Sequence, residues 1–309
     1  MPASQEPESQ EVKSGAAMTD LQQHFGSPVP DNFSVPLGLS RSGQPEKLYA
    51  KFSGKVSRYL ARHVATKKLA MRNAKPIISF TFDDVPASAC DTGVRILEQY
   101  GIRGTFYIAG AGFGRNSPVG ILATPEELRT AWRRGHEIGC QTHYHSAVSR
   151  LSRDELQLEF HCNQDALKKI DASVPVRNFA YPYGDLSFGA RRQLEALFDC
   201  CRSVDNGINS GVANLGALKS WPLENASLDR SKIAALIAET VRINGWLIFF
   251  SHDVGEQPSR FGIDPGLLEW TVKTAKQSGA IVAPIADSLK YAAGSAVDTR
   301  RNAHPGPRS

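Results

Sequence analysis

Four short clusters of polar residues follow apolar runs of strand length, and each contains groups that could take part in chemistry. The first holds the adjacent carboxylates Asp83 and Asp84, which could act as an acid or base or bind a cation. The second ends in His145, which could bind a metal through a neutral imidazole nitrogen. The third, residues 179–185, contains a Pro and Gly turn that could aim a backbone N–H at a shared site, and the fourth ends in His252. These residue types indicate catalysis or metal binding.

The elements that must position these clusters are predicted from a regular alternation of apolar runs and helical stretches. Parallel strands joined by crossover helices produce such an alternation. Strands are predicted at residues 77–82, 104–109, 136–142, 178–181, 200–204, 217–223, 245–251 and 280–284, and helices near residues 92–100, 125–134, 153–170, 188–197, 230–244 and 265–277. An α/β fold with seven or eight parallel strands in succession favours a distorted (β/α) barrel.

A barrel fold favours a functional role of the polar clusters over a purely structural one. An Asp-Asp pair after a strand, taken alone, is explained equally well as a cap of the following helix. In a parallel barrel, however, the C-terminal ends of the strands form the active face. Because the clusters close predicted strands, we expect Asp83, Asp84, His145 and His252 to face one mouth.

Composition limits the class of protein. The chain has 309 residues, of which 41% are hydrophobic and 22% charged, as is ordinary for a globular protein. No apolar run reaches the roughly 18 residues of a membrane span. The five cysteines have no metal-binding spacing, so reduced, buried thiols are expected. The net charge of +5 is modest and the basic stretch lacks interleaved aromatic residues, so nucleic-acid binding is not expected.

The two ends differ from the central part in composition. Residues 1–45 are rich in Ser, Pro, Gly, Gln and Glu, so we expect a disordered or loosely wrapped extension. Residues 46–75 are predicted to form a basic amphipathic helix that packs on the barrel, with a membrane-surface contact as the alternative. Residues 76–292 form the predicted barrel, and residues 293–309 a flexible tail. The polar N-terminus does not resemble a secretory signal, so a cytoplasmic location is expected, at the inner face of the membrane if the basic helix binds there.

In order and separation, the clusters resemble the motifs of the polysaccharide deacetylases of carbohydrate esterase family four, which include the nodulation-type chitooligosaccharide deacetylases. The resemblance covers roughly residues 75–292, with motifs at residues 81–86, 135–145, 179–184, 221–222 and 249–252. It implies a hydrolase that removes N-acetyl groups from an N-acetylated glycan or a lipid-linked sugar precursor on a distorted (β/α) barrel. A divalent metal, expected to be zinc, would activate the attacking water.

The resemblance also implies roles for individual residues. Asp83 matches the general base and His252 the general acid. Tyr183 would supply a backbone N–H for the oxyanion, and the side chains of Tyr183 and Trp221 would form apolar walls for a sugar ring. These roles agree with elementary chemistry, because a base must take a proton from water and an acid must protonate the departing amine.

The metal ligands implied by the resemblance are Asp84, His145 and the residue four positions before His145. That residue is Gln141, where the family has a histidine. An amide oxygen is a poorer ligand for zinc than imidazole. Three outcomes stay open: Gln141 binds the metal weakly or through water, His143 takes its place, or the metal is lost.

Two further partners of the family's catalytic residues have no match. Ala180 stands where the family has an arginine that pairs with the base, and no acidic residue that would tune the catalytic histidine lies near Lys219. Asp253, Arg202 and Asp205 are the candidate replacements. If these departures have abolished hydrolysis, the chain is a sugar-binding relative. The other alternative is a metal-independent amidase that acts on a small ureide or a formamide.

Overall fold

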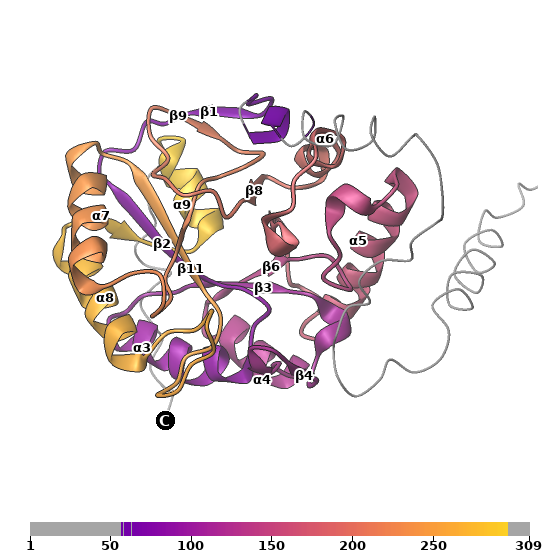
Figure 1. Ribbon diagram of the computed structural model, residues 1–309, viewed down its shortest axis with the longest axis horizontal. Helices are drawn as coiled ribbons and strands as arrows, with labels where there is room; N and C mark the ends of the chain where they lie inside the picture. Colours follow the sequence, from indigo (N-terminus) through magenta and orange to yellow (C-terminus); the bar gives the residue numbers. More distant parts are fainter. Residues whose placement is uncertain (1–56, 58, 63, 296–309) are drawn as a thin grey trace, which may run out of the picture.

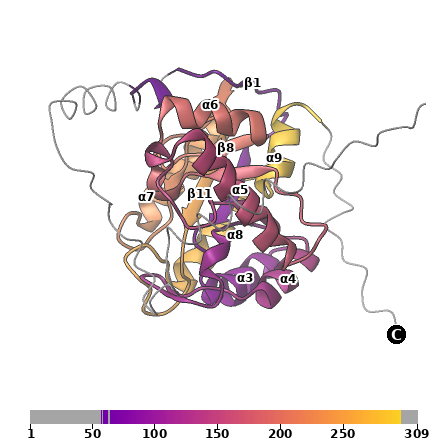
Figure 2. The same cartoon turned by 90° about the vertical axis from the view of Figure 1, so that its right-hand side faces the viewer.

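The computed structural model of the protein describes residues 57, 59–62 and 64–295. Residues 1–45, residues 46–56, 58 and 63 of the predicted basic helix, and residues 296–309 lie outside the described residues, so the predictions for them stay predictions. Within the described part of 46–75, residues 59–62 are helical, but Lys68–Ala70 form a strand, so the helix does not continue to residue 75. The described part is a curved sheet with helices around it (Figures 1 and 2). None of its helices combines the length and the apolar character needed to cross a membrane.

A parallel sheet of eight strands forms the centre of the fold, in agreement with the predicted barrel. The strands follow one another in the order β10, β11, β2, β3, β6, β7 and β8, and β12 pairs with the first residues of β2. Hydrogen bonds of 2.8 Å from Ser203 N–H to Leu218 O and from Leu218 N–H to Cys201 O link the two ends of this order. The strands are β2 (Ile77–Phe82), β3 (Thr105–Ile108), β6 (Glu137–Cys140), β7 (Asn178–Ala180), β8 (Cys200–Arg202), β10 (Trp221–Pro222), β11 (Trp246–Ser251) and β12 (Ile281–Val282).

Helices cover the outside of this sheet (Figure 1). They are α3 (Val94–Gln99), α4 (Pro125–Arg133), α5 (Arg153–Lys168), α6 (Phe188–Leu197), α7 (Arg230–Arg242), α8 (Pro265–Gln277) and α9 (Ile285–Ala292). The sequence patterns do not predict α9 or two small antiparallel pairs, β1 (Lys68–Ala70) with β9 (Val212–Asn214) and β4 (Asn116–Ser117) with β5 (Gly120–Ile121). The strand predicted at 217–223 is reduced to β10, because residues 215 and 218 bond to β8 before the chain reaches β11.

The helix α5 has a well-defined start. Ser152 Oγ accepts the Glu155 N–H, and the Glu155 carboxylate accepts the Ser152 N–H, which together form a capping box. The same arrangement, between Thr124 and Glu127, starts α4. These caps set where each helix begins and satisfy N–H groups that have no partner within the helix.

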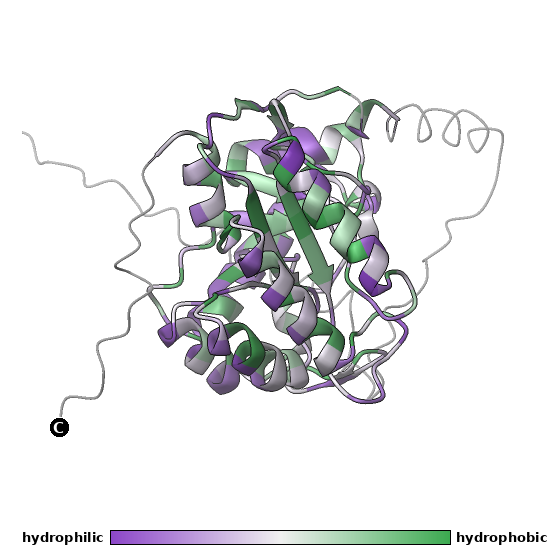
Figure 3. Cartoon of the chain, turned by 90° about the vertical axis from the view of Figure 1, so that its left-hand side faces the viewer, coloured by the Kyte–Doolittle hydropathy of each residue, from purple (hydrophilic) through white to green (hydrophobic). Residues whose placement is uncertain are grey.

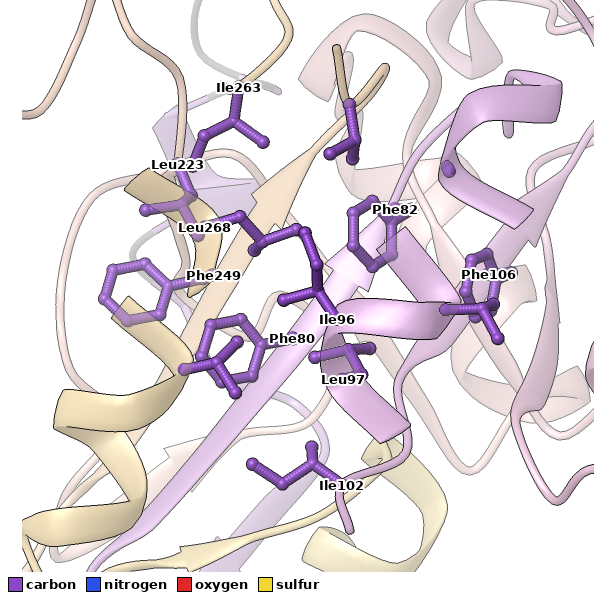
Figure 4. Packing of buried hydrophobic residues seen from close by; sticks show 14 of the residues in the cluster. Phe80, Phe82, Ile96, Leu97, Ile102, Phe106, Leu223, Phe249, Ile263 and Leu268 are labelled. Carbon is purple, nitrogen blue, oxygen red and sulfur yellow. The ribbon is translucent and has the colours of Figure 1, made fainter. Parts of the chain in front are cut away.

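Strands β2 and β3 alternate between apolar and polar side chains. Phe80, Phe82 and Phe106 pack against α3 and α8 in the main hydrophobic cluster (Figure 4), and the rings of Phe82 and Phe106 stack at 5.1 Å. The alternate residues point to the opposite face, where Thr81 Oγ1 donates to the Phe249 carbonyl at 2.9 Å. Figure 3 shows the apolar character of the central strands. The hydrophobic core therefore lies largely between strands and helices, and much of the barrel interior is polar.

The polar groups at the base of the interior are hydrogen-bonded. The Glu137 carboxylate accepts Thr105 Oγ1 at 2.7 Å, Asn178 Nδ2 at 2.5 Å and the Ala286 N–H at 3.1 Å. These bonds join β3, β6 and β7 to the first turn of α9. The helix that the sequence patterns miss is thus held by a side chain at the start of β6.

The five cysteines are free thiols, as the sequence predicts. Cys140, Cys200 and Cys201 are buried, and burial raises the pKa of Cys140 and of Cys201 to about 12. Because the thiolate is the reactive form, these buried residues are not suited to nucleophilic catalysis.

A buried neutral histidine supports the base of the sheet. His136 is fully buried, its Nδ1 accepts the Gly104 N–H at 3.1 Å, and its Nε2 lies 3.3 Å from Glu98. Burial, aided by the neighbouring Arg103 and Arg134, lowers the pKa of His136 to about 3. His136 therefore binds a proton below about pH 6.5 in the unfolded chain, but only below about pH 3 in the folded chain.

We expect the free energy of unfolding to fall as the pH drops from about 6.5 to about 3, by roughly 1.4 kcal/mol per pH unit from this group. The difference in urea-unfolding free energy between the parent and His136→Gln, measured across this pH range, isolates the contribution. His161→Gln is the matched control, because His161 is exposed on α5. An equal slope in the parent and in His136→Gln would contradict the prediction.

Candidate active site

The predicted catalytic residues lie at the C-terminal ends of the strands. Asp83 and Asp84 follow β2 directly, and His252 follows β11, which pairs with the whole of β2. The Asp83 N–H donates to Ser251 O at 2.8 Å and continues this pairing past the strand ends. His145 lies in the loop after β6 and meets Asp84 there. The structure thus brings these four side chains to one end of the sheet.

The loops of this site have a strained backbone. Six non-glycine residues of the described chain have φ between 48° and 61°, a conformation that costs on the order of 1–3 kcal/mol. Five of the six lie in these loops, namely Asp84, Val85, Thr142, His145 and Tyr183. Such strain persists only where surrounding contacts hold it, and it concentrates at functional sites.

Asp83 forms a buried ion pair with Arg202. Arg202 Nη2 donates to both carboxylate oxygens, at 2.6 Å and 2.5 Å, and the two side chains are 5% and 0% exposed. The guanidinium carbon lies 5.3 Å from the Tyr107 ring centre and 4.9 Å from that of Phe250. The arginine therefore neutralises the buried charge of Asp83 and is itself held between two aromatic rings.

The position of Arg202 accounts for the alanine found where the family has an arginine. Ala180 on β7 and Arg202 on β8 are direct register partners. The guanidinium that reaches the predicted base therefore comes from the same level of the barrel, one strand further along. Of the three candidate replacements that the sequence offers, Arg202 is the one that contacts Asp83.

Asp84 and His145 provide two candidate ligand atoms for a cation. His145 Nε2 lies 3.0 Å from Asp84 Oδ1, and this buried oxygen has no hydrogen-bond partner in the described part of the chain. A buried carboxylate oxygen without a donor is unfavourable unless a positive group occupies its lone pairs. The two atoms therefore fit a shared divalent cation.

Gln141 is held against the same loop. It is buried, and its amide oxygen accepts the Asp84 N–H at 3.0 Å, which leaves one lone pair of that oxygen. His143, the alternative ligand, packs its ring on Tyr144 at 4.6 Å and lies beside Gly110. Among the described residues, no group of three or more His, Cys, Asp or Glu side chains could hold a metal. A cation at this site would have two strong ligands rather than three.

His252 is oriented by the loop that follows it. Its Nδ1 lies 3.3 Å from the Phe261 carbonyl oxygen, so Nδ1 carries the hydrogen and donates it. Its Nε2 lies 4.0 Å from Asp84 Oδ2. The ring is thus fixed with the second nitrogen facing the carboxylates.

The structure adds Glu224, a residue that the sequence analysis did not single out. Pro222 pairs with Phe250, and Leu223 N–H donates to Phe250 O at 2.7 Å, so the next residue, Glu224, lies level with His252. Glu224 is 8% exposed, and burial raises its pKa, while a hydrogen bond from Ser227 and the nearby His252 act in the opposite direction. An acidic residue two positions after the Trp-Pro motif is the sequence signal that could have identified it.

The other two candidate replacements have different partners. The Asp253 carboxylate accepts the Ser259 N–H at 2.7 Å and Ser259 Oγ at 2.5 Å within its own loop. Asp205 forms an ion pair with Arg62 at 3.0 Å. Glu224 is therefore the carboxylate that lies level with the predicted acid His252.

The two predicted sugar-binding side chains differ in exposure. Tyr183 is 61% exposed, and its ring lies 4.4 Å from that of His145, so it is available at the mouth. Trp221 is partly buried against the main hydrophobic cluster, and its indole N–H has no hydrogen-bond partner in the described residues. Tyr183 is the better placed of the two to contact a sugar.

Part of the chain matches a known protein family. Residues 70–197 match the family model described as polysaccharide deacetylase, a region that contains Asp83, Asp84, Gln141, His145 and Tyr183. This region is a polysaccharide deacetylase domain. Its relatives include chitin deacetylase from Colletotrichum lindemuthianum, 25% identical over 181 residues that cover 59% of this chain and 68% of the relative.

Other curated relatives are larger than the matched region. Chitin deacetylase 1 of Cryptococcus neoformans is 27% identical over 36% of this chain, which corresponds to 22% of that protein. The peptidoglycan N-acetylglucosamine deacetylase PgdA of Listeria monocytogenes is 23% identical over 48% of this chain and 31% of its own length. The aligned part of this chain thus spans about a fifth to two thirds of the length of these relatives.

Solved structures support the fold of the deacetylase domain. The chitin deacetylase of Colletotrichum lindemuthianum has a TM-score of 0.51 at 18% identity, covering 74% of this chain and 92% of that one. The Xyl-CE4 domain of a xylanase from the hindgut metagenome of Trinervitermes trinervoides has a TM-score of 0.50 at 19% identity, covering 72% and 93%. At these identities the likeness establishes the barrel fold.

The buried Asp83–Arg202 pair leads to a prediction about stability. Arg202→Met leaves an uncompensated buried carboxylate and should lower the free energy of unfolding by about 3–5 kcal/mol. The double variant Arg202→Met with Asp83→Asn should recover much of this loss, because the unpaired charge is gone. Urea unfolding of the parent, both single variants and the double variant measures the coupling.

The matched control is Arg62→Met, which removes the exposed arginine of the Arg62–Asp205 pair. It should cost less than about 1 kcal/mol. Strictly additive effects of Arg202→Met and Asp83→Asn would show that the two side chains are not coupled.

Proposed function

We propose that this chain is a metal-dependent hydrolase that removes N-acetyl groups from an N-acetylated glycan or a lipid-linked sugar precursor. The observation that carries the proposal is the grouping at one mouth of a paired carboxylate, Asp83, a candidate cation pair, Asp84 and His145, and an oriented imidazole, His252. The deacetylase domain and its chitin and peptidoglycan deacetylase relatives support this choice of reaction.

The chain's own residues perform the proton transfers in this proposal. Asp83 takes a proton from the attacking water, because each of its oxygens keeps a lone pair beyond the bond from Arg202. His252 then donates a proton from Nε2 to the departing amine, while the Phe261 carbonyl holds Nδ1. Glu224 lies level with His252, close enough for the two side chains to interact electrostatically.

Asp84 and His145 would hold the cation, expected to be zinc. When bound there, a divalent cation supplies Lewis-acid polarisation of the amide carbonyl and activation of water. Tyr183 would add a backbone N–H for the oxyanion and an exposed ring for the sugar.

A second candidate is a sugar-binding relative without hydrolytic activity. The observation in its favour is that Gln141 gives its amide oxygen to the Asp84 N–H, so a third strong ligand is lacking among the described residues. A metal-independent amidase on a ureide or formamide is the other alternative. The cytoplasmic location and the membrane contact through residues 46–75 remain proposals from the sequence.

The general-base assignment predicts the effect of Asp83→Asn. Acetate release from N-acetylated chito-oligosaccharides and peptidoglycan fragments should fall by about 10²–10⁴-fold, because proton transfer is lost. Binding of zinc should stay close to that of the parent, because Asp83 does not contact the cation pair. Asp205→Asn, which changes a carboxylate paired with Arg62, is the control and should keep its activity. Full activity in Asp83→Asn, or loss of zinc binding there, would mean that the two carboxylate roles are misassigned.

Gln141→His tests the cation and separates the two candidate functions. An added imidazole ligand should tighten zinc binding by about 10- to 100-fold. Mutating a residue that only hydrogen-bonds to a metal ligand already changes metal affinity by this factor. Both side chains are neutral when they bind, so the gain would not arise from a change in ligand charge. Equilibrium dialysis with zinc, together with acetate release at limiting metal, measures both effects.

Unchanged affinity for zinc and cobalt in Gln141→His would contradict a cation shared by Asp84 and His145. Tighter binding without acetate release from any N-acetylated substrate would favour the sugar-binding relative. Substrate hydrolysis that is insensitive to chelators would favour the metal-independent amidase.

A further inference from the structure

The loop that carries His145 is attached to a buried carboxylate on α5. Glu159 Oε2 accepts two successive backbone N–H groups, from His143 at 2.7 Å and from Tyr144 at 2.9 Å. Glu159 Oε1 accepts Ser146 Oγ at 2.6 Å. The carboxylate thus binds the residues on both sides of His145.

The Glu159 carboxylate is buried, which is unusual for an acidic side chain. It is 8% exposed, and no ion pair to it is found within the described part of the chain. Burying an unpaired carboxylate is costly, and three hydrogen bonds from a single loop are its compensation. If this position served only to stabilise α5, an apolar side chain would do so without the cost of burying a carboxylate.

The attachment determines the direction of His145. Thr142 and His145 both have left-handed backbone conformations, with φ of 61° and 55°, and Thr142 Oγ1 accepts the Ser146 N–H at 2.9 Å. His145 lies outside any helix or strand, so regular secondary structure does not hold its backbone in place. The bonds to Glu159 hold the two residues before His145 and the one after it.

We propose that Glu159 is the positioning residue of the cation site: it holds the loop so that His145 Nε2 stays 3.0 Å from Asp84 Oδ1. The inference builds on the cation site of the proposed function but does not require that the chain cleave an amide. It adds a supporting residue to the cation site of Asp84 and His145, and that residue lies outside the motifs at residues 81–86, 135–145, 179–184, 221–222 and 249–252.

The same helix supplies a matched control. Asn163, one turn after Glu159, is fully buried; its Oδ1 accepts the Gly110 N–H at 2.8 Å and its Nδ2 donates to the Ile108 carbonyl at 3.0 Å. It bonds to the loop after β3 and, at 3.1 Å, to Cys140 Sγ at the end of β6, whereas the bonds to His143, Tyr144 and Ser146 come from Glu159. Its removal should therefore lower stability without changing the cation site.

The test is a titration of metal-free full-length protein with Co²⁺, followed by its visible absorption, and with Zn²⁺ in competition. Glu159→Gln keeps the size of the side chain but removes the charge, and it should weaken Co²⁺ binding by about 10- to 100-fold. Ser146→Ala removes one bond to Glu159 and should weaken binding by about two- to tenfold. Asn163→Ser should bind Co²⁺ as the parent does, although its thermal midpoint falls.

Several outcomes of the Co²⁺ titration would overturn the proposal. Parent-like Co²⁺ affinity in Glu159→Gln overturns the proposal, and so does a parent protein that binds no Co²⁺. If Glu159→Gln does not fold, Ser146→Ala decides, and parent-like affinity in that variant overturns the proposal. An equal loss of affinity in Asn163→Ser would assign the effect to general destabilisation and also overturn it. Acetate release is not part of this test, so failure of the hydrolase proposal remains a separate result.

Discussion

A buried charge that needs a partner determines the architecture of this site. Asp83 is placed inside the barrel mouth by the period of β2, which sends alternate residues inward, and an unpaired carboxylate there would be costly. Arg202 provides the compensation from β8, on the far end of the strand order, and two aromatic rings hold its guanidinium. The remaining polar groups at the mouth are arranged around this pair, with Asp84 and His145 beside it and His252 on the adjacent strand.

The sequence predicts the parts of the fold that repeat along the chain. Strand β2 and helices α6 and α8 have the predicted bounds, because each combines a clear period with a clear start or stop. The patterns miss α9, whose first turn is held by Glu137, and they overextend β10, whose preceding residues bond to β8. In both cases the deciding interaction joins residues that are distant in sequence, and a local pattern does not contain it.

The candidate site, like the fold, is predictable where local patterns decide and unpredictable where contacts between distant residues decide. The side chains at strand ends are visible in the sequence because strand ends are predictable, and the structure brings Asp83, Asp84, His145 and His252 together. The residues that support them are not visible in this way. Arg202 could be offered only as one of three candidates. Glu224 follows the Trp-Pro motif, but strand register places it beside His252, and Glu159 lies in no motif because it bonds to a loop that folds back on its helix.

The Asp83–Arg202 contact joins residues 119 positions apart in the chain. Contacts of such long range form slowly, because the intervening chain must be ordered before the contact contributes any stabilisation. In a chain in which β2 has folded but β8 has not docked, the Asp83 carboxylate has no guanidinium partner. The proposed site would therefore be complete only after β8 has docked, and a time course of acetate release during refolding would report that step.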